Sequence, residues 1–347
     1  LMVVDGVRMN NAIYRSGNLQ NIISIDPLTL EGAEVVFGPG SLIYGSDAIG
    51  GVMDFHTITP AFAESKKLQF KGSSTLRYAT ANKENTFHTD FNLSKGRWAF
   101  VSSFTYSKYD DLKMGVHGPA SYLRNEYIER INNIDSTVNN SNPRIQSFSG
   151  YEQLNLLQKV RYKLNDHVDM TYSFTYAGTG EAPRYDRLIQ YRNDKLRFAE
   201  WNYGPQKRLL SAYDLNISNK YALVKTMHLG VNYQNIEESR ITRKFNSTGR
   251  QSRIENVQVA GLNLDMTSIF GQQVFRYGIE SQFNKLKSTA NLYNLETGVT
   301  APLDTRYPDG DNTLFTSGVY LSHSVKLNNR FSFNDGVRLG LSHLHST

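Results

Sequence analysis

The sequence predicts a mainly β protein: a transmembrane antiparallel β-barrel, present in part as about eleven strands, with a small α/β segment before it. Three observations predict this fold. Long segments alternate apolar and polar residues with a period of two, and short connections alternate with long ones between these segments. The first sixty residues differ in texture, being rich in glycine and in short apolar runs.

Composition separates two kinds of membrane protein. Of the 347 residues, 39% are hydrophobic and 20% charged, and no stretch approaches the roughly 20 apolar residues that a transmembrane helix needs. A helical membrane protein is therefore excluded. A β-barrel is not, because its strands alternate lipid-facing and lumen-facing residues. The 21 tyrosines suit a membrane–water interface. A soluble all-β protein also favours tyrosine, so composition alone leaves both classes open.

Charge and cysteine content exclude other classes. The absence of cysteine rules out thiolate metal sites and cysteine nucleophiles. The net charge of +6 is spread along the chain without a Lys/Arg block, so no nucleic-acid partner is predicted. No Ser/His/Asp constellation is recognisable, and the chain is not predicted to be an enzyme.

Residues 1–60 predict one unit and residues 61–347 another. In the first, apolar runs at 1–4, 32–37 and 51–57 predict strands. Gly38-Pro39-Gly40 predicts a turn, after which Ser41 is expected to cap a brief helix ended by Gly45.

The clearest barrel strand lies around residues 168–176. Val168, Met170, Tyr172 and Phe174 alternate with polar residues there, and we expect these four side chains to face lipid. In residues 254–269 the apolar phase slips near Ala260, which indicates a β-bulge or a misjudged strand.

The connections between strands are of two kinds. Tight ones are expected at 94–97, 163–166, 218–220, 271–272 and 326–329, and mostly longer ones at 109–149, 178–207, 238–251 and 288–312. Outer-membrane barrels have this asymmetry, with short periplasmic turns and long extracellular loops. Leu1 and Thr347 both fall inside strand-like sequence, so we expect a segment of a longer protein that cannot form a stable closed barrel alone.

Several ordered motifs in the first unit resemble the plug of TonB-dependent receptors. They are Val4-Asp5-Gly6-Val7-Arg8, Asp26-Pro27, Glu34-Val35-Val36-Phe37-Gly38-Pro39 and Tyr44-Gly45-Ser46-Asp47-Ala48-Ile49-Gly50-Gly51-Val52. The resemblance implies the C-terminal part of a plug, inside a barrel of about 22 strands. It also implies residence in the outer membrane of a Gram-negative bacterium. TonB would act through an N-terminal box outside this sequence to drive uptake of a bulky, scarce nutrient.

The plug motif has a physical interpretation of its own. Gly45, Gly50 and Gly51 are expected to permit close backbone packing or positive φ angles. Asp5, Arg8, Glu34 and Asp47 are ionisable groups that a plug inside a polar lumen could pair with charges of the barrel wall. The alternative is that these residues hold the fold together and contact no ligand.

A narrower resemblance is to the haem and haemoglobin-type receptors of Bacteroidetes. It is carried by the spacing of residues 5–11, 14–21 and 25–27 and by residues 183–188 and 198–205. Such receptors offer an axial histidine in a Gly-His-Leu run, whereas this chain has Gly17-Asn18-Leu19, and asparagine is a poor haem ligand. Tyr14 could bind ferric iron instead, or be an ordinary packed tyrosine.

Three further residues are candidate ligand contacts. His117 lies in a predicted extracellular loop, and Arg184 and Arg187 lie in a basic, aromatic loop suited to haem propionates or ferric chelates. An ordinary solvated loop is the alternative. We expect no permanently bound cofactor and no metal site. The resemblance implies haem or another ferric chelate as the transported ligand, with the iron-bearing ligand itself or a haemoprotein as the partner. A siderophore or cobalamin receptor, a non-transporting adhesion barrel and an outer-membrane hydrolase stay open as alternatives.

Overall fold

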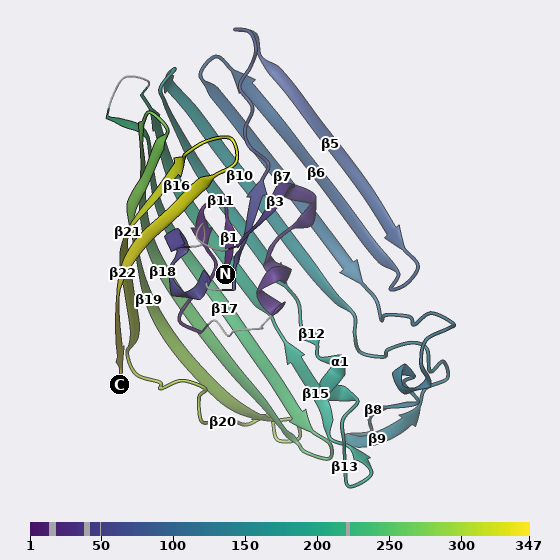
Figure 1. Cartoon of the computed structure of the whole chain (residues 1–347). Helices are drawn as coiled ribbons and strands as arrows, with labels where there is room; N and C mark the ends of the chain where they lie inside the picture. Colours follow the sequence, from purple (N-terminus) through teal and green to yellow (C-terminus); the bar gives the residue numbers. More distant parts are fainter. Residues whose placement is uncertain (14–18, 38–41, 49, 220–222) are drawn as a thin grey trace.

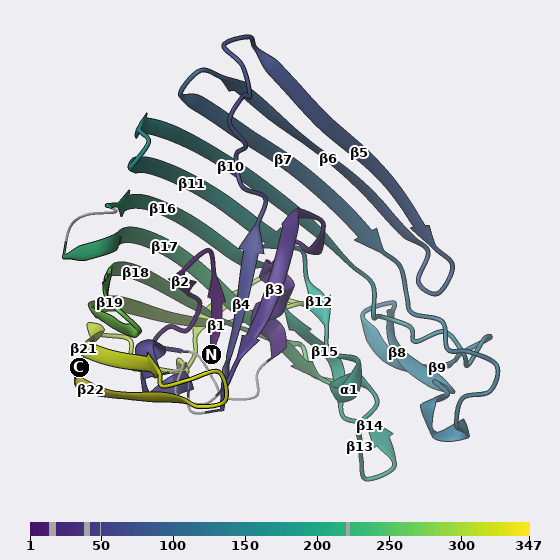
Figure 2. The ribbon, with the colours of Figure 1, turned by 45° about the horizontal axis from the view of Figure 1, so that its top comes forward.

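A curved antiparallel sheet wraps part of the way around a smaller sheet (Figures 1 and 2). This is a computed structural model, and it describes residues 1–13, 19–37, 42–48, 50–219 and 223–347. The small sheet lies in the concavity of the large one, and the N-terminal residue lies there too (Figure 1).

Within the described residues, eleven long strands follow one another in chain order along the large sheet, as predicted. They are β5 (Gln69–Ala79), β6 (Glu84–Lys95), β7 (Trp98–Tyr109), β10 (Tyr151–Asn165), β11 (Val168–Thr179), β16 (Gln206–Ser218), β17 (Val224–Lys244), β18 (Gly249–Phe270), β19 (Gln273–Asn294), β21 (Asn312–Lys326) and β22 (Ser332–Ser346). Each exceeds the ~9–11 residues that a tilted membrane strand needs, or equals the upper value.

The small sheet has the strand order β2-β1-β4-β3. Its strands are β1 (Met2–Val4), β2 (Val7–Arg8), β3 (Leu30–Val36) and β4 (Val52–Thr57), and the 3-10 turns η1 (Leu19–Ser24), η2 (Pro27–Thr29) and η4 (Ser46–Ala48) connect them. Asp5 and Gly6 both have positive φ angles, which an Asp-Gly hairpin turn requires. Ser41, the expected helix cap, lies outside the described residues, and residues 42–44 form a 3-10 turn where a brief helix was expected.

The convex face of the large sheet is apolar across the strands. Directly paired residues on eight consecutive strands form one row on this face: Phe70, Leu93, Phe100, Val160, Tyr172, Tyr213, Val231 and Leu262. The side chain of Tyr172 is 44% exposed, whereas the next residue, Ser173, is 6% exposed and faces the concave side. This alternation is what a lipid-facing wall with a polar lumen requires.

Tyr172 tests the assignment of the faces. We expect Tyr172→Lys to destabilise the barrel by roughly 2–4 kcal/mol if the position lies near the bilayer midplane, because lipid cannot solvate the charge. Thr171→Lys, on the lumen side of the same strand, is the matched control and should cost much less. Unfolding of the complete receptor in lipid vesicles measures both changes, and equal costs would contradict the lipid-facing position of Tyr172.

The bulge expected near Ala260 is absent from β18. The pairing of β18 with β17 and with β19 runs without a register shift through this position. The apolar phase slips because β18 uses both faces. Val257 and Val259 belong to a buried cluster with Ile13, which follows β2, and are fully buried. Leu262, on the opposite phase, is exposed on the lipid face.

The prediction of a long loop at 238–251 is also wrong. Strands β17 and β18 continue through most of this range and pair as far as Thr242 and Gln251, leaving only residues 245–248 as a turn. The polar sequence of this range resembles a loop, but a strand outside the membrane needs no apolar face. In the same way β19 extends to Asn294, so the link expected at 288–312 shortens to 295–311.

The two remaining long connections contain short elements at one end of the sheet, at the bottom of Figure 1. They are η5 (Ala120–Tyr122), β8 (Glu126–Ile131), β9 (Ile134–Asn139), β12 (Ala182–Pro183), α1 (Tyr185–Leu188), β13 (Tyr191–Arg192), β14 (Lys195–Leu196) and β15 (Phe198–Tyr203), and β20 (Thr300–Pro302) lies in the 295–311 link. By the loop asymmetry this end is extracellular. Among the described helices, none has the length and apolar character to cross a bilayer.

Gly50, in the turn before β4, does not have the close packing or the positive φ angle that we expected. Gly51 has a φ of +115°, and a Cβ there would lie 2.9 Å from the ring of Phe37. Gly50 has open space around it and no positive φ. We therefore expect Gly51→Ala to destabilise the unit by about 1–3 kcal/mol and Gly50→Ala to have little effect. Thermal unfolding of the complete receptor measures both; the reverse order would contradict this assignment of backbone strain.

Candidate functional site: the plug–wall interface and the extracellular rim

A chain of charges joins the small sheet to the wall. Arg8 on β2 pairs with Asp47 and lies 3.5 Å from the Glu280 carboxylate on β19. Glu280 also pairs with Arg338 of β22 at 2.7 Å, and Arg338 donates a hydrogen bond to the carbonyl of Ile43. These five groups come from four segments that are far apart in sequence, so this series of contacts fixes the small sheet against β19 and β22.

A second ion pair holds the other side of the same hairpin. Lys159 of β10 is buried, and its ammonium group lies 3.1 Å from the Asp5 carboxylate. Asp5 in turn accepts hydrogen bonds from the backbone N–H and the hydroxyl of Thr57 on β4. A buried ammonium group needs such a partner. Asp5 therefore connects the hairpin to β4 through hydrogen bonds and to the wall through the ion pair.

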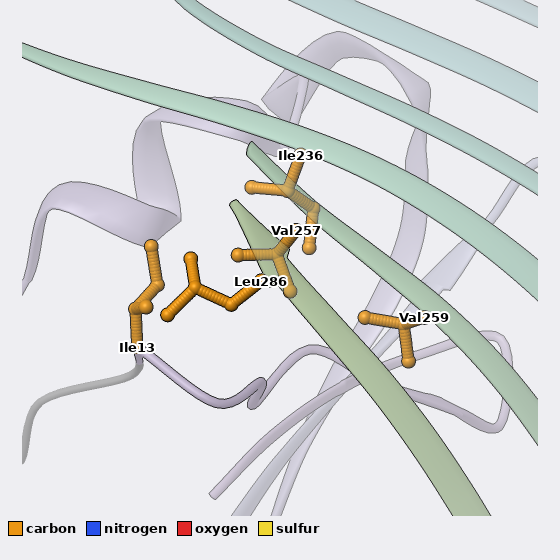
Figure 3. Packing of buried hydrophobic residues seen from close by; sticks show 5 residues of the cluster. All are labelled: Ile13, Ile236, Val257, Val259 and Leu286. Carbon is orange, nitrogen blue, oxygen red and sulfur yellow. The ribbon is translucent and has the colours of Figure 1, made fainter. Parts of the chain in front are cut away.

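Residues 10–13 follow β19 toward the extracellular end. Gln282 donates to the carbonyl of Asn10, and the backbone N–H of Ala12 donates to Asn284, both at 3.1 Å. Ile13 then packs against Leu286 and its apolar neighbours on β17 and β18 (Figure 3).

Buried charges hold the extracellular hairpin β8–β9 in place. The Asp135 carboxylate is fully buried and accepts two hydrogen bonds from Arg243 of β17, at 2.6 and 2.8 Å, and one from the backbone N–H of Asn246. Arg243 also pairs with Glu200 of β15 at 2.6 Å. Three connections of the rim therefore meet at one ion cluster.

The predicted contact Arg184 is used inside the protein. Its guanidinium pairs with Asp186 at 2.6 Å and lies over the rings of Trp201 and Tyr203. The hydrogen bond from Arg184 lowers the pKa of the Asp186 carboxyl, which keeps it charged. Arg187 lies 3.6 Å from the same carboxylate. Part of the positive charge that we expected to bind an anionic ligand is therefore neutralised by Asp186.

The rim also contains a cleft of about 670 Å³ at the extracellular ends of β6, β7, β10 and β11. Its lining includes the aromatic residues Tyr109, Phe148 and Tyr151 and the basic residues Lys108 and Lys113. Its four acids are already engaged: Asp110 with Lys83, Asp111 with backbone N–H groups, Glu152 with Tyr106 and Glu181 with Arg250. No ion pair within the described residues engages Lys108 or Lys113. The cleft is therefore positive and partly aromatic.

The structure places the other predicted residues as follows. Asp5, Gly6, Arg8, Tyr44, Gly45 and Gly51 lie in the small sheet or its turns, Gly50 is exposed there, and Glu34 is exposed on β3. Burial and Asp54 raise the pKa of Tyr44 to about 12. His117 is exposed in the 110–150 connection, away from the cleft lining. Tyr14, Asn18, Gly38 and Pro39 lie outside the described residues. Among the described side chains, no cluster of three or more His, Asp or Glu is arranged to hold a metal ion.

Sequence reasoning missed the wall partners Lys159, Glu280 and Arg338. All three are charged residues on the polar phase of a strand whose other lumen-facing positions are mostly small or neutral. That combination was a readable signal, because a charge facing the lumen of a membrane strand needs a partner.

A wall of tilted antiparallel strands, with an apolar outer face and a small α/β unit fixed against its polar inner face, defines a plugged outer-membrane barrel. Residues 1–52 match the family described as "TonB-dependent Receptor Plug Domain". The vitamin B12 transporter BtuB of Vibrio vulnificus is 25% identical over 332 residues, which cover 94% of this chain and 44% of the relative. The hemin receptor of Yersinia enterocolitica is 39% identical over 61 residues, 18% of this chain and 8% of that receptor.

Solved structures show the same fold. The copper transporter OprC superposes with a TM-score of 0.71 at 14% identity, covering 93% of this chain and 44% of OprC. The FrpB iron transporter of Neisseria meningitidis gives 0.66 at 12% identity, covering 99% and 53%. The chain spans about half the length of these relatives.

Residues 1–52 are therefore a plug domain of the TonB-dependent receptor type, and the strands that follow have the fold of part of an outer-membrane transporter barrel. Receptors of this family are non-enzymatic and reside in the Gram-negative outer membrane, which agrees with the prediction of a non-enzymatic outer-membrane protein.

Proposed function

We propose that this receptor is a TonB-dependent transporter for active uptake of a bulky iron-bearing nutrient, haem or another ferric chelate. The plug would comprise residues 1–60 and the barrel part residues 61–347. The observation that carries the proposal is the way the plug occupies the concavity of the wall, held by the Arg8–Glu280 and Asp5–Lys159 pairs. Passive diffusion needs an open lumen. A plug held by buried charges needs an external force to move it, which TonB supplies in this family.

The rim cleft supports the class of ligand. A volume of about 670 Å³ lies in the range of ~300–1,000 Å³ usual for small-molecule sites. Unpaired Lys108 and Lys113 favour an anionic ligand, and the rings of Tyr109 and Tyr151 favour a flat or ring-bearing one. Haem, with two propionates and a planar macrocycle, fits this description, and so does a ferric catecholate chelate.

A cobalamin ligand is the second candidate, because the relative that covers 94% of this chain is a vitamin B12 transporter. Uptake of haem, a ferric catecholate chelate and cobalamin should be measured in cells that carry the complete receptor, with and without TonB. We expect TonB-dependent uptake of haem or the chelate. Uptake of cobalamin alone would replace the iron-bearing ligand, and binding without uptake would support a non-transporting receptor.

The cleft lysines give a sharper test of the ligand site. Lys108→Gln together with Lys113→Gln should weaken binding of the anionic ligand by about tenfold and reduce its dependence on salt, because two unpaired charges are lost. Lys95→Gln, at the periplasmic turn, is the control and should bind as the unaltered receptor does. Equal affinities in a titration of the purified receptors would exclude the cleft as the binding site.

A further inference from the structure

Arg124 is a buried cation of the extracellular rim that has no ionic partner. It lies between η5 and β8 in the 110–150 connection and is 3% exposed. Within the described residues, no carboxylate pairs with it, and its Nε and Nη1 atoms have no hydrogen-bond partner. Its Cζ atom lies 5.1 Å from the centroid of the Tyr185 ring, at the start of α1. An aromatic ring is therefore the main neighbour of a guanidinium group that has lost its water.

The other buried lysine and arginine side chains of the described chain are satisfied. Lys159 and Arg243 pair with carboxylates, and Arg208 donates to a backbone carbonyl and to a glutamine side chain. Burial of a charge without such an acceptor is strongly unfavourable. Burial accordingly lowers the pKa of Arg124, although neighbouring groups act in the opposite direction. A residue that breaks a folding rule in this way is expected at a functional site.

The Arg124 side chain lies close to the rim cleft. Asp111, which lines the cleft, is one of the charges that act on Arg124. Phe148 also lines the cleft, and its ring packs edge-on against Tyr127 of β8, with the centroids 5.5 Å apart. Arg124 is not part of the present lining of the cleft. It is therefore next to the proposed ligand site and separated from it by the residues that form one side of the cleft.

Two connections of the rim meet at Arg124. The 110–150 connection contributes Arg124 and is held to the wall by the buried ion pair of Asp135. The 178–207 connection contributes Tyr185 and is held by the pairing of β12 with β15. A hydrogen bond from the Tyr191 hydroxyl to Glu126, at 2.7 Å, joins the two connections and is exposed to solvent. The two connections can therefore separate at Arg124 without breaking either anchor.

The charge around Arg124 matches a single negative charge. On the Tyr185 side, Arg184 and Arg187 are engaged by Asp186. On the cleft side, Asp111 adds negative charge. A dianion such as phosphate would leave one charge without compensation here, whereas Arg124 alone neutralises a carboxylate. The guanidinium and carboxylate groups are both planar and form short, charge-assisted hydrogen bonds.

We propose that Arg124 selects a carboxylate-bearing ligand: the ligand inserts one carboxylate between the two connections, beside Tyr185, and the Arg124 guanidinium binds it. This rests on the proposed transport function and narrows its ligand to haem or a ferric carboxylate chelate in place of a catecholate. The guanidinium lacks an acceptor until the ligand arrives, so satisfying its Nε and Nη1 atoms contributes to the free energy of binding.

Arg124→Met tests the ligand-free state of the complete receptor. Methionine keeps much of the length and apolar volume of arginine without its charge. We expect hydrogen exchange over residues 120–131 to stay the same or to slow by up to about tenfold, because an unpaired buried charge is removed. Arg192→Met changes an exposed arginine of β13 and is the matched control, with no effect expected. Faster exchange in Arg124→Met alone would show that the guanidinium stabilises the rim and would overturn the proposal.

Haem and its dimethyl ester test the ligand. The two probes share the macrocycle and differ in the propionates, which are free carboxylates in haem alone. In titrations of the purified complete receptors, Arg124→Met should weaken haem binding by about thirtyfold and change binding of the ester by less than about twofold. Arg192→Met should bind both probes as the unaltered receptor does. Equal weakening of both probes by Arg124→Met would mean general damage to the site, and unchanged haem binding would mean that Arg124 contacts no carboxylate; either result overturns the proposal.

Uptake by cells separates this proposal from the transport function on which it rests. Ferric citrate is the second carboxylate probe, and the same loss is expected in Arg124→Met if it is the ligand bound. TonB-dependent uptake of a catecholate chelate or of cobalamin, without binding of haem or ferric citrate, would overturn the carboxylate anchor and leave transport standing. Haem uptake that is the same with and without TonB would reject the transport function, whereas the comparison of haem with its ester would still test Arg124.

Discussion

Replacing Glu280 with alanine should loosen the plug by about 3–5 kcal/mol, the cost typical of removing one partner from a buried ion pair. Among the described residues, Glu280 is the one carboxylate that pairs with Arg338, and it is one of two carboxylates that pair with Arg8. Its loss leaves two largely buried guanidinium groups, with Asp47 as the remaining carboxylate partner of Arg8. Hydrogen exchange over residues 2–8 of the complete receptor should rise accordingly.

Glu237→Ala is the matched control for this change. Glu237 is also a barrel-strand carboxylate in an ion pair, with Lys207 at 3.0 Å, but the pair is exposed. Exposed pairs contribute about 0–1 kcal/mol, so the plug should keep its protection in this variant. If both variants exchange alike, the charge chain does not hold the plug.

Replacing Asp135 with alanine should release the hairpin β8–β9 from the rim. The change leaves Arg243, 4% exposed, with Glu200 as its remaining carboxylate, and removes the acceptor of the Asn246 N–H. We expect local opening to become easier by about 3–5 kcal/mol, which corresponds to roughly a hundredfold or greater loss of amide protection over residues 126–139. Hydrogen exchange followed by mass spectrometry resolves this segment.

Glu129→Gln provides the control within the same hairpin. Glu129 is exposed, and a surface change of this kind usually alters stability by less than about 0.5 kcal/mol. A hairpin that stays protected in Asp135→Ala would show that its backbone pairing, and not the buried carboxylate, fixes it to the rim.

The sequence predicted the barrel strands well because each membrane strand must satisfy two solvents at once. Val168 to Phe174 shows this: lipid selects one phase and the lumen selects the other. The prediction of strand phase failed where the plug, in addition to lipid and lumen, contacts a strand. Val257 and Val259 are apolar on the lumen phase because Ile13 of the plug covers them. A strict alternation of lipid-facing and lumen-facing residues does not allow for such positions, so the sequence indicated a bulge there.

The candidate site was harder to predict, because its residues come together only through the curvature of the sheet. Lys108 and Lys113 flank a strand end, and their significance depends on the acids around them being engaged by other groups. Arg184 illustrates the opposite case. Its positive charge is evident from the sequence. Sequence spacing does not show, however, that the Arg184 guanidinium pairs with the Asp186 carboxylate and lies over the Trp201 ring.

The length of β17 and β18 has a consequence for what approaches the cell. The apolar outer series of β17 stops at Tyr233, yet the strand continues to Lys244 and stays paired with β18 as far as Thr242. At ~3.4 Å per residue and a tilt of about 45°, this ladder rises on the order of 20 Å above the lipid surface. The paired ends of β17 and β18 therefore form a stiff projection on one side of the extracellular opening. A large particle, such as an antibody or a phage tail, would therefore meet the extended ends of β17 and β18 before it reached the shorter strands β5 and β6.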